Sequence, residues 1–185
     1  MPDTTVHIAF LDLLKGQPET SYIGAVLVTD SLGVPVEFRC THPVKPTEIQ
    51  RQLYGSTLQR HVGVELCGKP LLKSLQNPPR LVFTKLELLL GVREASPVPV
   101  LFVRYAGEVL RVDQGPAGGG TEVKVDPKNS NIQPIILRSD ARFESDPETA
   151  KEILEEVLLN VDPIEPFERI NKAVAMLIKQ DARFQ

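Results

Sequence analysis

The stretch from Ser21 to Gly55 constrains the fold of this chain more than any other part of its sequence. Residues 22–29 are apolar on both parities, which is typical of a strand covered on both faces. A turn at residues 30–33 leads into an alternating strand, whose buried face is expected to carry Val36 and Phe38. Two strands joined by a short turn indicate an antiparallel pair.

A helix is predicted directly after this pair of strands. Thr47 and Gln50 have the spacing of a capping box, in which the threonine hydroxyl caps the glutamine amide and the glutamine side chain caps in return. Gly55 is expected to end the helix, because the apolar residues before and after it would lie on opposite faces of one continuous helix.

The C-terminal part carries the clearest helical pattern of the chain. Apolar residues recur at helical spacing within residues 145–159 and again within residues 166–179, with a short linker between them. A chain of 185 residues with 42% hydrophobic residues is expected to form one core-bearing domain. We therefore predict an α+β fold, with a mixed, mainly antiparallel sheet and short central helices over residues 1–143. An antiparallel helical pair over residues 144–185 is expected to pack on the same domain.

The charge pattern argues against a surface that binds phosphate. The net charge is −3, and the nine acidic residues between Glu144 and Glu168 are opposed only by Lys151. An acidic stretch of this kind repels nucleic acid and anionic membranes, so we expect neither as a partner. With two cysteines and no apolar run approaching ~20 residues, the chain is expected to be cytoplasmic.

Three charged residues around the second turn could support hydrolysis. Asp30 and Glu37 could together hold a divalent cation, and Arg39 could act beside them. The set is similar to the carboxylate pair and basic residue of the PD-(D/E)xK nucleases, although that family generally has lysine where Arg39 stands. The alternative is structural, because Glu37 and Arg39 are two residues apart on one strand and can form a solvent-exposed ion pair.

Four residues have side chains that suit zinc, but their spacing does not. Cys40, His42, His61 and Cys67 form C-x-H and H-x5-C pairs, whereas structural zinc sites generally use two tight pairs such as C-x2-C. Cys40 and His42 also continue the apolar face of their strand, as a small hydrophobic residue and a rim histidine would. We therefore expect no metal at these residues.

Tyr54 is a candidate ligand-binding residue because it stands beside the helix-ending Gly55. A tyrosine in this place could present its ring and hydroxyl to a ligand, with Lys45 and Arg51 nearby in sequence. The alternative is that Tyr54 packs on the surface with its hydroxyl at the rim.

The sequence holds no G-x-S-x-G nucleophile motif and no P-loop. From these missing motifs we predict a non-catalytic interaction module, an accessory or adaptor subunit, with another protein as partner and no cofactor. The alternative is a metal-dependent hydrolase or nuclease-like enzyme that uses Asp30, Glu37 and Arg39. The oligomeric state stays open.

Overall fold

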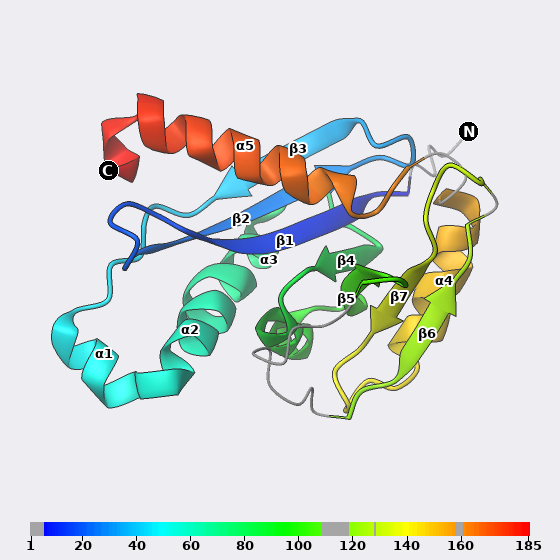
Figure 1. Cartoon of the computed structure of the whole chain (residues 1–185), viewed down its shortest axis with the longest axis horizontal. Helices are drawn as coiled ribbons and strands as arrows, with labels where there is room; N and C mark the ends of the chain where they lie inside the picture. Colours follow the sequence, from blue (N-terminus) through cyan, green and yellow to red (C-terminus); the bar gives the residue numbers. More distant parts are fainter. Residues whose placement is uncertain (1–5, 109–118, 128, 158–160) are drawn as a thin grey trace.

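A computed structural model of the chain describes residues 6–108, 119–127, 129–157 and 161–185. In this described part, seven strands form one mixed sheet in the order β3-β2-β1-β4-β5-β7-β6 (Figure 1). The strands are β1 (Ile8–Lys15), β2 (Tyr22–Thr29), β3 (Pro35–Cys40), β4 (Leu81–Thr84), β5 (Val100–Tyr105), β6 (Glu122–Val125) and β7 (Ile135–Arg138).

The centre of the sheet is parallel and its flanks are antiparallel. β1 pairs parallel with β4, and β4 pairs parallel with β5. On one side β2 and β3 continue the sheet antiparallel, and on the other β7 and β6 do the same. Because β1, β4 and β5 run in one direction, their carboxyl ends lie at the same edge of the sheet.

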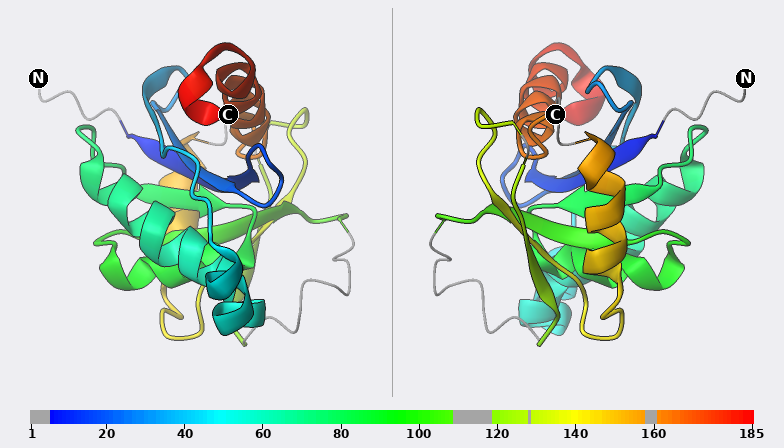
Figure 2. Two further views of the ribbon diagram at one scale, coloured as in Figure 1. Left: turned by 90° about the vertical axis from the view of Figure 1, so that its left-hand side faces the viewer. Right: turned by 90° about the vertical axis from the view of Figure 1, so that its right-hand side faces the viewer.

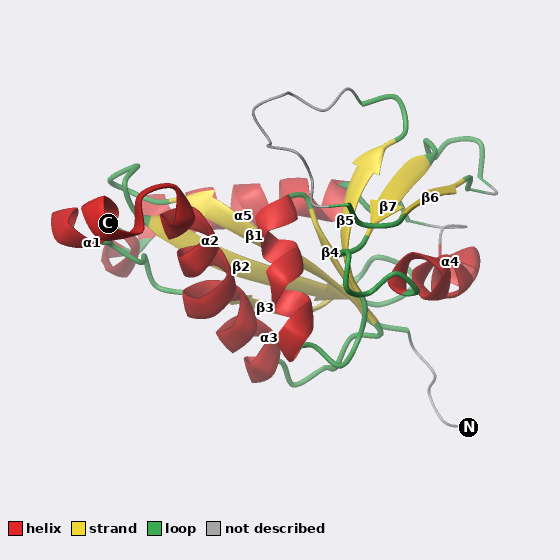
Figure 3. Cartoon of the chain, turned by 90° about the horizontal axis from the view of Figure 1, so that it is seen from below, coloured by secondary structure: helices red, strands yellow, loops and turns green. Residues whose placement is uncertain are grey.

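Helices cover both faces of the sheet. The regular helices are α1 (Glu48–Tyr54), α2 (Leu58–His61), α3 (Lys69–Ser74), α4 (Asp146–Val157) and α5 (Glu165–Gln180). The single turns and irregular helices are η1 (Gly55–Thr57), η2 (Val62–Gly68), η3 (Glu87–Ala95) and η4 (Ala182–Phe184). The two layers are seen end-on in Figure 2, and Figure 3 shows the helices around the strands.

Each face of the sheet has its own hydrophobic core. The core under α4 and α5 contains Phe10 and Phe83 from the strands, together with Leu154 and Ile170 from the helices. The opposite core lies under α2, η2, α3 and η3. Every residue of β2 is buried because this strand is covered on both faces, as the sequence predicts.

The capping box at the start of α1 is present. The Gln50 amide donates to Thr47 Oγ1 at 3.2 Å, and the Thr47 amide donates to Gln50 Oε1 at 2.9 Å. Gly55 ends α1 with a φ of 51°, a region that glycine adopts readily. Two local signals therefore set both ends of this helix, as predicted.

The predicted α+β class is confirmed, including the mixed sheet and the C-terminal helical pair α4 and α5. Both helices insert their apolar stripes into the same core. α4 packs on β5 and β6, whereas α5 packs on β1 and β2. The predicted end of the first helix at Leu159 lies outside the described residues.

The prediction for the faces of β3 is wrong. Val36 and Phe38 are 39% and 38% exposed, while Glu37 and Arg39 on the other face are partly covered. β3 is an edge strand with β2 as its one neighbour in the sheet. At this edge the helical layer does not cover the apolar face of β3. A prediction from alternation alone therefore named the wrong face as buried.

No helix in the described part of the chain combines the length and the apolar character needed to cross a bilayer.

Candidate functional site

One carboxylate lies near the carboxyl end of the central strand β1. Asp12 is on the same face as Phe10, and Phe10 pairs with Phe83 of β4. Continuing this parallel register by two residues places Asp12 beside Lys85, which directly follows β4. Ligands of open sheets that contain parallel strands generally bind outside the carboxyl ends of those strands. This edge is therefore the first place to look for a site.

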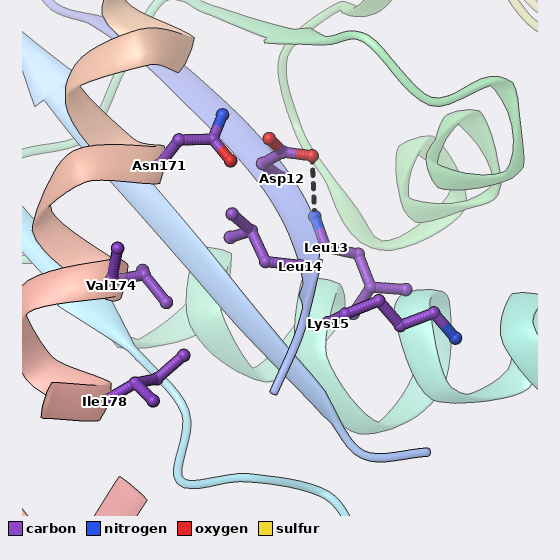
Figure 4. Close-up of a pocket in the computed structure, with 8 residues that line it drawn as sticks. Asp12, Leu13, Leu14, Lys15, Asn171, Val174 and Ile178 are labelled. Atoms are coloured by element: carbon purple, nitrogen blue, oxygen red, sulfur yellow. Dashed lines mark hydrogen bonds between the residues drawn. The ribbon is translucent and has the colours of Figure 1, made fainter. Parts of the chain in front are cut away.

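A pocket of about 300 Å³ opens between β1 and α5 at this edge. Its lining residues are Asp12, Leu13, Leu14, Lys15, Asn171, Val174, Ala175 and Ile178. Figure 4 shows the side chains of Asp12 and Asn171 next to each other at one end of the pocket, with apolar side chains along the rest. The pocket thus combines an apolar wall with a few polar groups, which is typical of ligand sites.

Asp12 has a perturbed environment for a carboxylate. Its Oδ1 accepts a hydrogen bond from the Leu13 amide at 2.8 Å. Burial raises the pKa of Asp12, while the Leu13 bond and the positive charge of Lys85 act in the opposite direction. A carboxyl group with a raised pKa in a pocket, beside a specific charge, is a candidate functional group.

Lys85 is partly buried and has no protein partner in the described part of the chain. No hydrogen bond or ion pair to its ammonium is found there, although its charge acts on Asp12. Asn171 Nδ2 donates to the Phe167 carbonyl at 2.8 Å, which leaves its second N–H and its Oδ1 for a ligand. Asp12 and Asn171 in the pocket, and Lys85 beside Asp12, are therefore polar groups at this edge that are available to a ligand.

A second polar contact lies at the same edge of the sheet, at the end of β5. The hydroxyl of Tyr105, the last residue of β5, donates to Asp162 Oδ2 at 2.6 Å. Burial, followed by the Asp162 bond and the negative charges of Asp162 and Glu168, raises the pKa of Tyr105. Tyr105 therefore stays neutral, and its bond fastens the end of β5 to the segment that leads into α5.

The side chains of this site do not fit a metal centre built by the protein. Within the described ranges, no group of three or more His, Cys, Asp or Glu side chains could hold a metal ion. The charged side chain that acts on Asp12 is Lys85, which is a cation. A metal site would need a second carboxylate in its place. We therefore derive no step through a metal.

In the structure Glu37 and Arg39 pair with each other, whereas Asp30 makes contacts within its own turn. Asp30 Oδ1 accepts bonds from two amides of its own turn, both at 2.9 Å. Glu37 accepts a bond from Arg39 Nε and three bonds from Asn77 and the Gln76 amide, at 2.9–3.0 Å for its Oε2. Although burial opposes ionisation, these bonds lower the pKa of Glu37 to about 2. A catalytic role for the three residues stays a prediction.

The four zinc-type side chains lie in different surroundings. Cys67 is buried, with its Sγ 3.9 Å from a threonine hydroxyl, and Cys40 is partly buried in β3. Burial raises the pKa of both thiols. His42 stacks on Phe184, and His61 stacks on the Tyr54 ring instead.

The three candidate ligand-binding residues near α1 also have protein partners. The Tyr54 hydroxyl lies 3.4 Å from His61 Nε2. Arg51 donates to the carbonyl of Thr20 at 3.2 Å and to a carbonyl before the helix at 3.0 Å. Lys45 Nζ donates to the carbonyl of Gln185 at 2.9 Å. A ligand-binding role for these residues stays a prediction.

Sequence reasoning missed Asp12 and Lys85. Asp12 interrupts an apolar run in which His7 is the one other polar residue. An ionisable group inside a strand that is otherwise buried is costly, so this interruption was a usable signal. Lys85 gave no such signal, because its proximity to Asp12 depends on how strands far apart in sequence pair.

Comparisons with known proteins identify the fold but no family. No family model matches the sequence, and no curated protein matches it. The Endonuclease V structure from Bacillus subtilis is 12% identical, covers 96% of this chain and 83% of its own, and has a TM-score of 0.55. The Endonuclease V structure from Streptomyces avermitilis is 13% identical, with 97% and 84% coverage and a TM-score of 0.52.

A third structure, with a TM-score of 0.48 and 14% identity, is the Ciona intestinalis Endonuclease V in complex with a 23mer DNA. It covers 97% of this chain and 88% of its own. At these identities the likeness concerns the fold alone.

Two predictions made from the sequence are corrected by this likeness. The chain was expected to be a non-catalytic interaction module with a protein partner, and nucleic acid was set aside as a partner. The two solved structures described above with a TM-score over 0.5 are both Endonuclease V structures. The first prediction rested on missing motifs and the second on overall charge. Neither gives information about the fold.

Proposed function

We propose that this chain binds nucleic acid and hydrolyses phosphodiester bonds at the Asp12 pocket. The observation that carries the proposal is a partly buried carboxylate in a pocket at the carboxyl end of β1. It lies in a fold shared with two Endonuclease V structures. The sheet edge is where this arrangement of strands generally binds ligands.

The chemistry assigned to Asp12 is that of a general base. Its carboxylate accepts a proton from a water molecule, and the water oxygen forms a bond to phosphorus. The bond between phosphorus and the leaving sugar oxygen breaks, and that oxygen takes a proton from solvent. Burial, which raises the pKa of Asp12, also makes its carboxylate a stronger base than an exposed aspartate.

Part of the acidic segment that argued against nucleic acid lies away from this pocket, whereas Glu165 and Glu168 belong to α5, which forms one wall of it. The α4 portion of the segment packs on β5 and β6, on the same face of the sheet as α5 but toward the opposite edge from β3 (Figure 1).

The basic residues near the end of β1 have contacts of their own. The Lys15 side chain points away from the pocket, with its Nζ 4.0 Å from the centre of the Tyr22 ring (Figure 4). Arg51 and Lys45 donate to main-chain carbonyls. The positive charge that acts on Asp12 is that of Lys85, so this lysine is the cation that a phosphate would meet beside the pocket.

The test is cleavage of labelled single-stranded and double-stranded DNA and RNA oligonucleotides by wild type and Asp12→Asn. We expect the substitution to lower the cleavage rate by about a hundredfold or more, because it removes the base. Asp126→Asn is the matched control, since the side chain of Asp126 is 67% exposed. Asp126 directly follows β6, the strand at the other edge of the sheet from β3. Equal cleavage by wild type and Asp12→Asn, or no cleavage of any substrate, would contradict the proposal.

A further inference from the structure

We infer that Lys85 is a phosphate anchor, which positions a phosphodiester of a bound nucleic acid beside Asp12. The inference rests on the proposed function and adds a positioning residue to the same site. It starts from the register of the parallel strands, in which Phe10 faces Phe83 and the chain continues to Asp12 on one strand and Lys85 after the other.

The surroundings of Lys85 differ from those of an ordinary surface lysine. Its side chain is partly buried, and the described residues offer its ammonium neither a hydrogen bond nor an ion pair. Other cations of the molecule do have partners, as Arg93 has in Asp146 at 2.7 Å. An ammonium carries three hydrogen-bond donors, and those of Lys85 remain available to an anionic ligand at this place.

Asp12 does not neutralise Lys85. No ion pair within 4.0 Å joins them among the described side chains, although the lysine charge reaches the carboxylate. The arrangement leaves the ammonium free to bind a phosphate oxygen, while the carboxylate lies beside the same phosphate. Lysine serves as a point charge for phosphate in many nucleotide sites, so its chemistry suits this role.

The two residues therefore have different roles. Lys85 attracts and positions the phosphate, and Asp12 acts on the water that attacks it. The negative charge of Asp12 opposes phosphate binding, so removing it is expected to strengthen binding as it abolishes cleavage. This opposite response distinguishes an anchor-and-base pair from two residues that simply stabilise the fold.

The experiment measures the binding of a fluorescent single-stranded oligonucleotide in EDTA at several salt concentrations. For Lys85→Gln we expect about fivefold weaker binding, irrespective of base sequence, and a slope of log affinity against log salt that is smaller by about 1. Lys85→Arg is expected to keep the affinity and the slope, and Asp12→Asn to bind more tightly than wild type. The matched control is Lys124→Gln, because Lys124 is an exposed lysine of β6 that pairs with Asp126.

The outcomes separate this inference from the proposed function. If wild type binds and cleaves nucleic acid while Lys85→Gln keeps the wild-type affinity and salt slope, the inference fails and the proposed function stands. Weaker binding by Lys85→Gln with an unchanged salt slope would also overturn it, because the lysine would then act through structure. If wild type neither binds nor cleaves, both proposals fall together. Melting temperatures of all variants show whether each one is folded.

Discussion

At the scale of single residues, the surroundings of Asp12 are unfavourable for the charged form of its side chain. Its carboxyl group is partly desolvated, and burial is the largest influence on its pKa. The main chain offers it one hydrogen bond, from the Leu13 amide. A group that destabilises the folded state when it is charged is often retained because it serves a site.

We therefore predict that Asp12→Asn raises the melting temperature at pH 7. A raised pKa means that the folded state binds the Asp12 proton more tightly than the unfolded state does. The associated stability is complete at low pH and is lost as the pH rises through the folded pKa. Melting curves at pH 7 and pH 4 should show an advantage of the variant that shrinks at the lower pH. A variant less stable than wild type at pH 7 would mean that the charged carboxylate supports the fold.

Glu37 shows the opposite behaviour and holds a loop in place. Its side chain is 9% exposed and accepts bonds from the Gln76 and Asn77 amides, which belong to the loop after α3. The sequence suggested an exposed pair with Arg39 that matters little. The loop that covers Glu37 is 39 to 40 residues away along the chain, so no local pattern reports the contact.

We predict that Glu37→Gln destabilises the protein by roughly 1–3 kcal/mol at pH 7, because an amide cannot accept this set of bonds. The pKa of Glu37 is lowered to about 2, so its contribution is present above the usual glutamate pKa of 4.5. That contribution disappears as the pH falls from 4.5 toward 2, and the two proteins should converge there. Denaturant unfolding at pH 7 and pH 3 measures this, with the exposed Glu48→Gln as control. A loss below about 0.3 kcal/mol would show that the loop does not depend on Glu37.

At the scale of elements, α5 both closes the core and forms one wall of the pocket. Phe167, Ile170 and Val174 are buried against the strands. Val174 also lines the pocket, together with the exposed Asn171 and Ala175. The position of the pocket therefore depends on how firmly the stripe of α5 packs on β1 and β2.

We predict that Ile170→Ala destabilises the protein by ~2–5 kcal/mol, because the side chain is fully buried and its removal leaves a cavity. Met176→Ala on the exposed side of the same helix is the control and should change stability by less than about 0.5 kcal/mol. Chemical denaturation of both variants provides the measurement. Similar losses for the two would mean that α5 is not anchored through its stripe.

At the scale of the whole molecule, the arrangement of charge matters more than its sum. The net charge of −3 hides an uneven distribution, because nine acidic residues between Glu144 and Glu168 are opposed only by Lys151. Identities of 12% and 13% to structures of the same fold show how far sequence can diverge while the layers persist. Net charge alone does not describe the charge that a partner would meet, because a folded chain separates its charges in space.

The sequence by itself determined the local structure of this protein. The capping box of Thr47 and Gln50, the helix end at Gly55 and the apolar stripes of α4 and α5 depend on residues within one or two helical turns. Interactions of this range are present in any conformation that forms the element, so the pattern of residues reports them. The α+β class follows from the order of these elements.

Only the tertiary structure decided which residues meet. The neighbours Asp12 and Lys85 are brought together by the parallel pairing of β1 with β4, and Glu37 is covered by a distant loop. The exposed face of β3 follows from its place at the sheet edge. Strand order and register result from packing two cores on opposite faces of one sheet, and that balance involves the whole chain at once. No stretch of sequence encodes it alone, so the candidate site became visible only in the folded molecule.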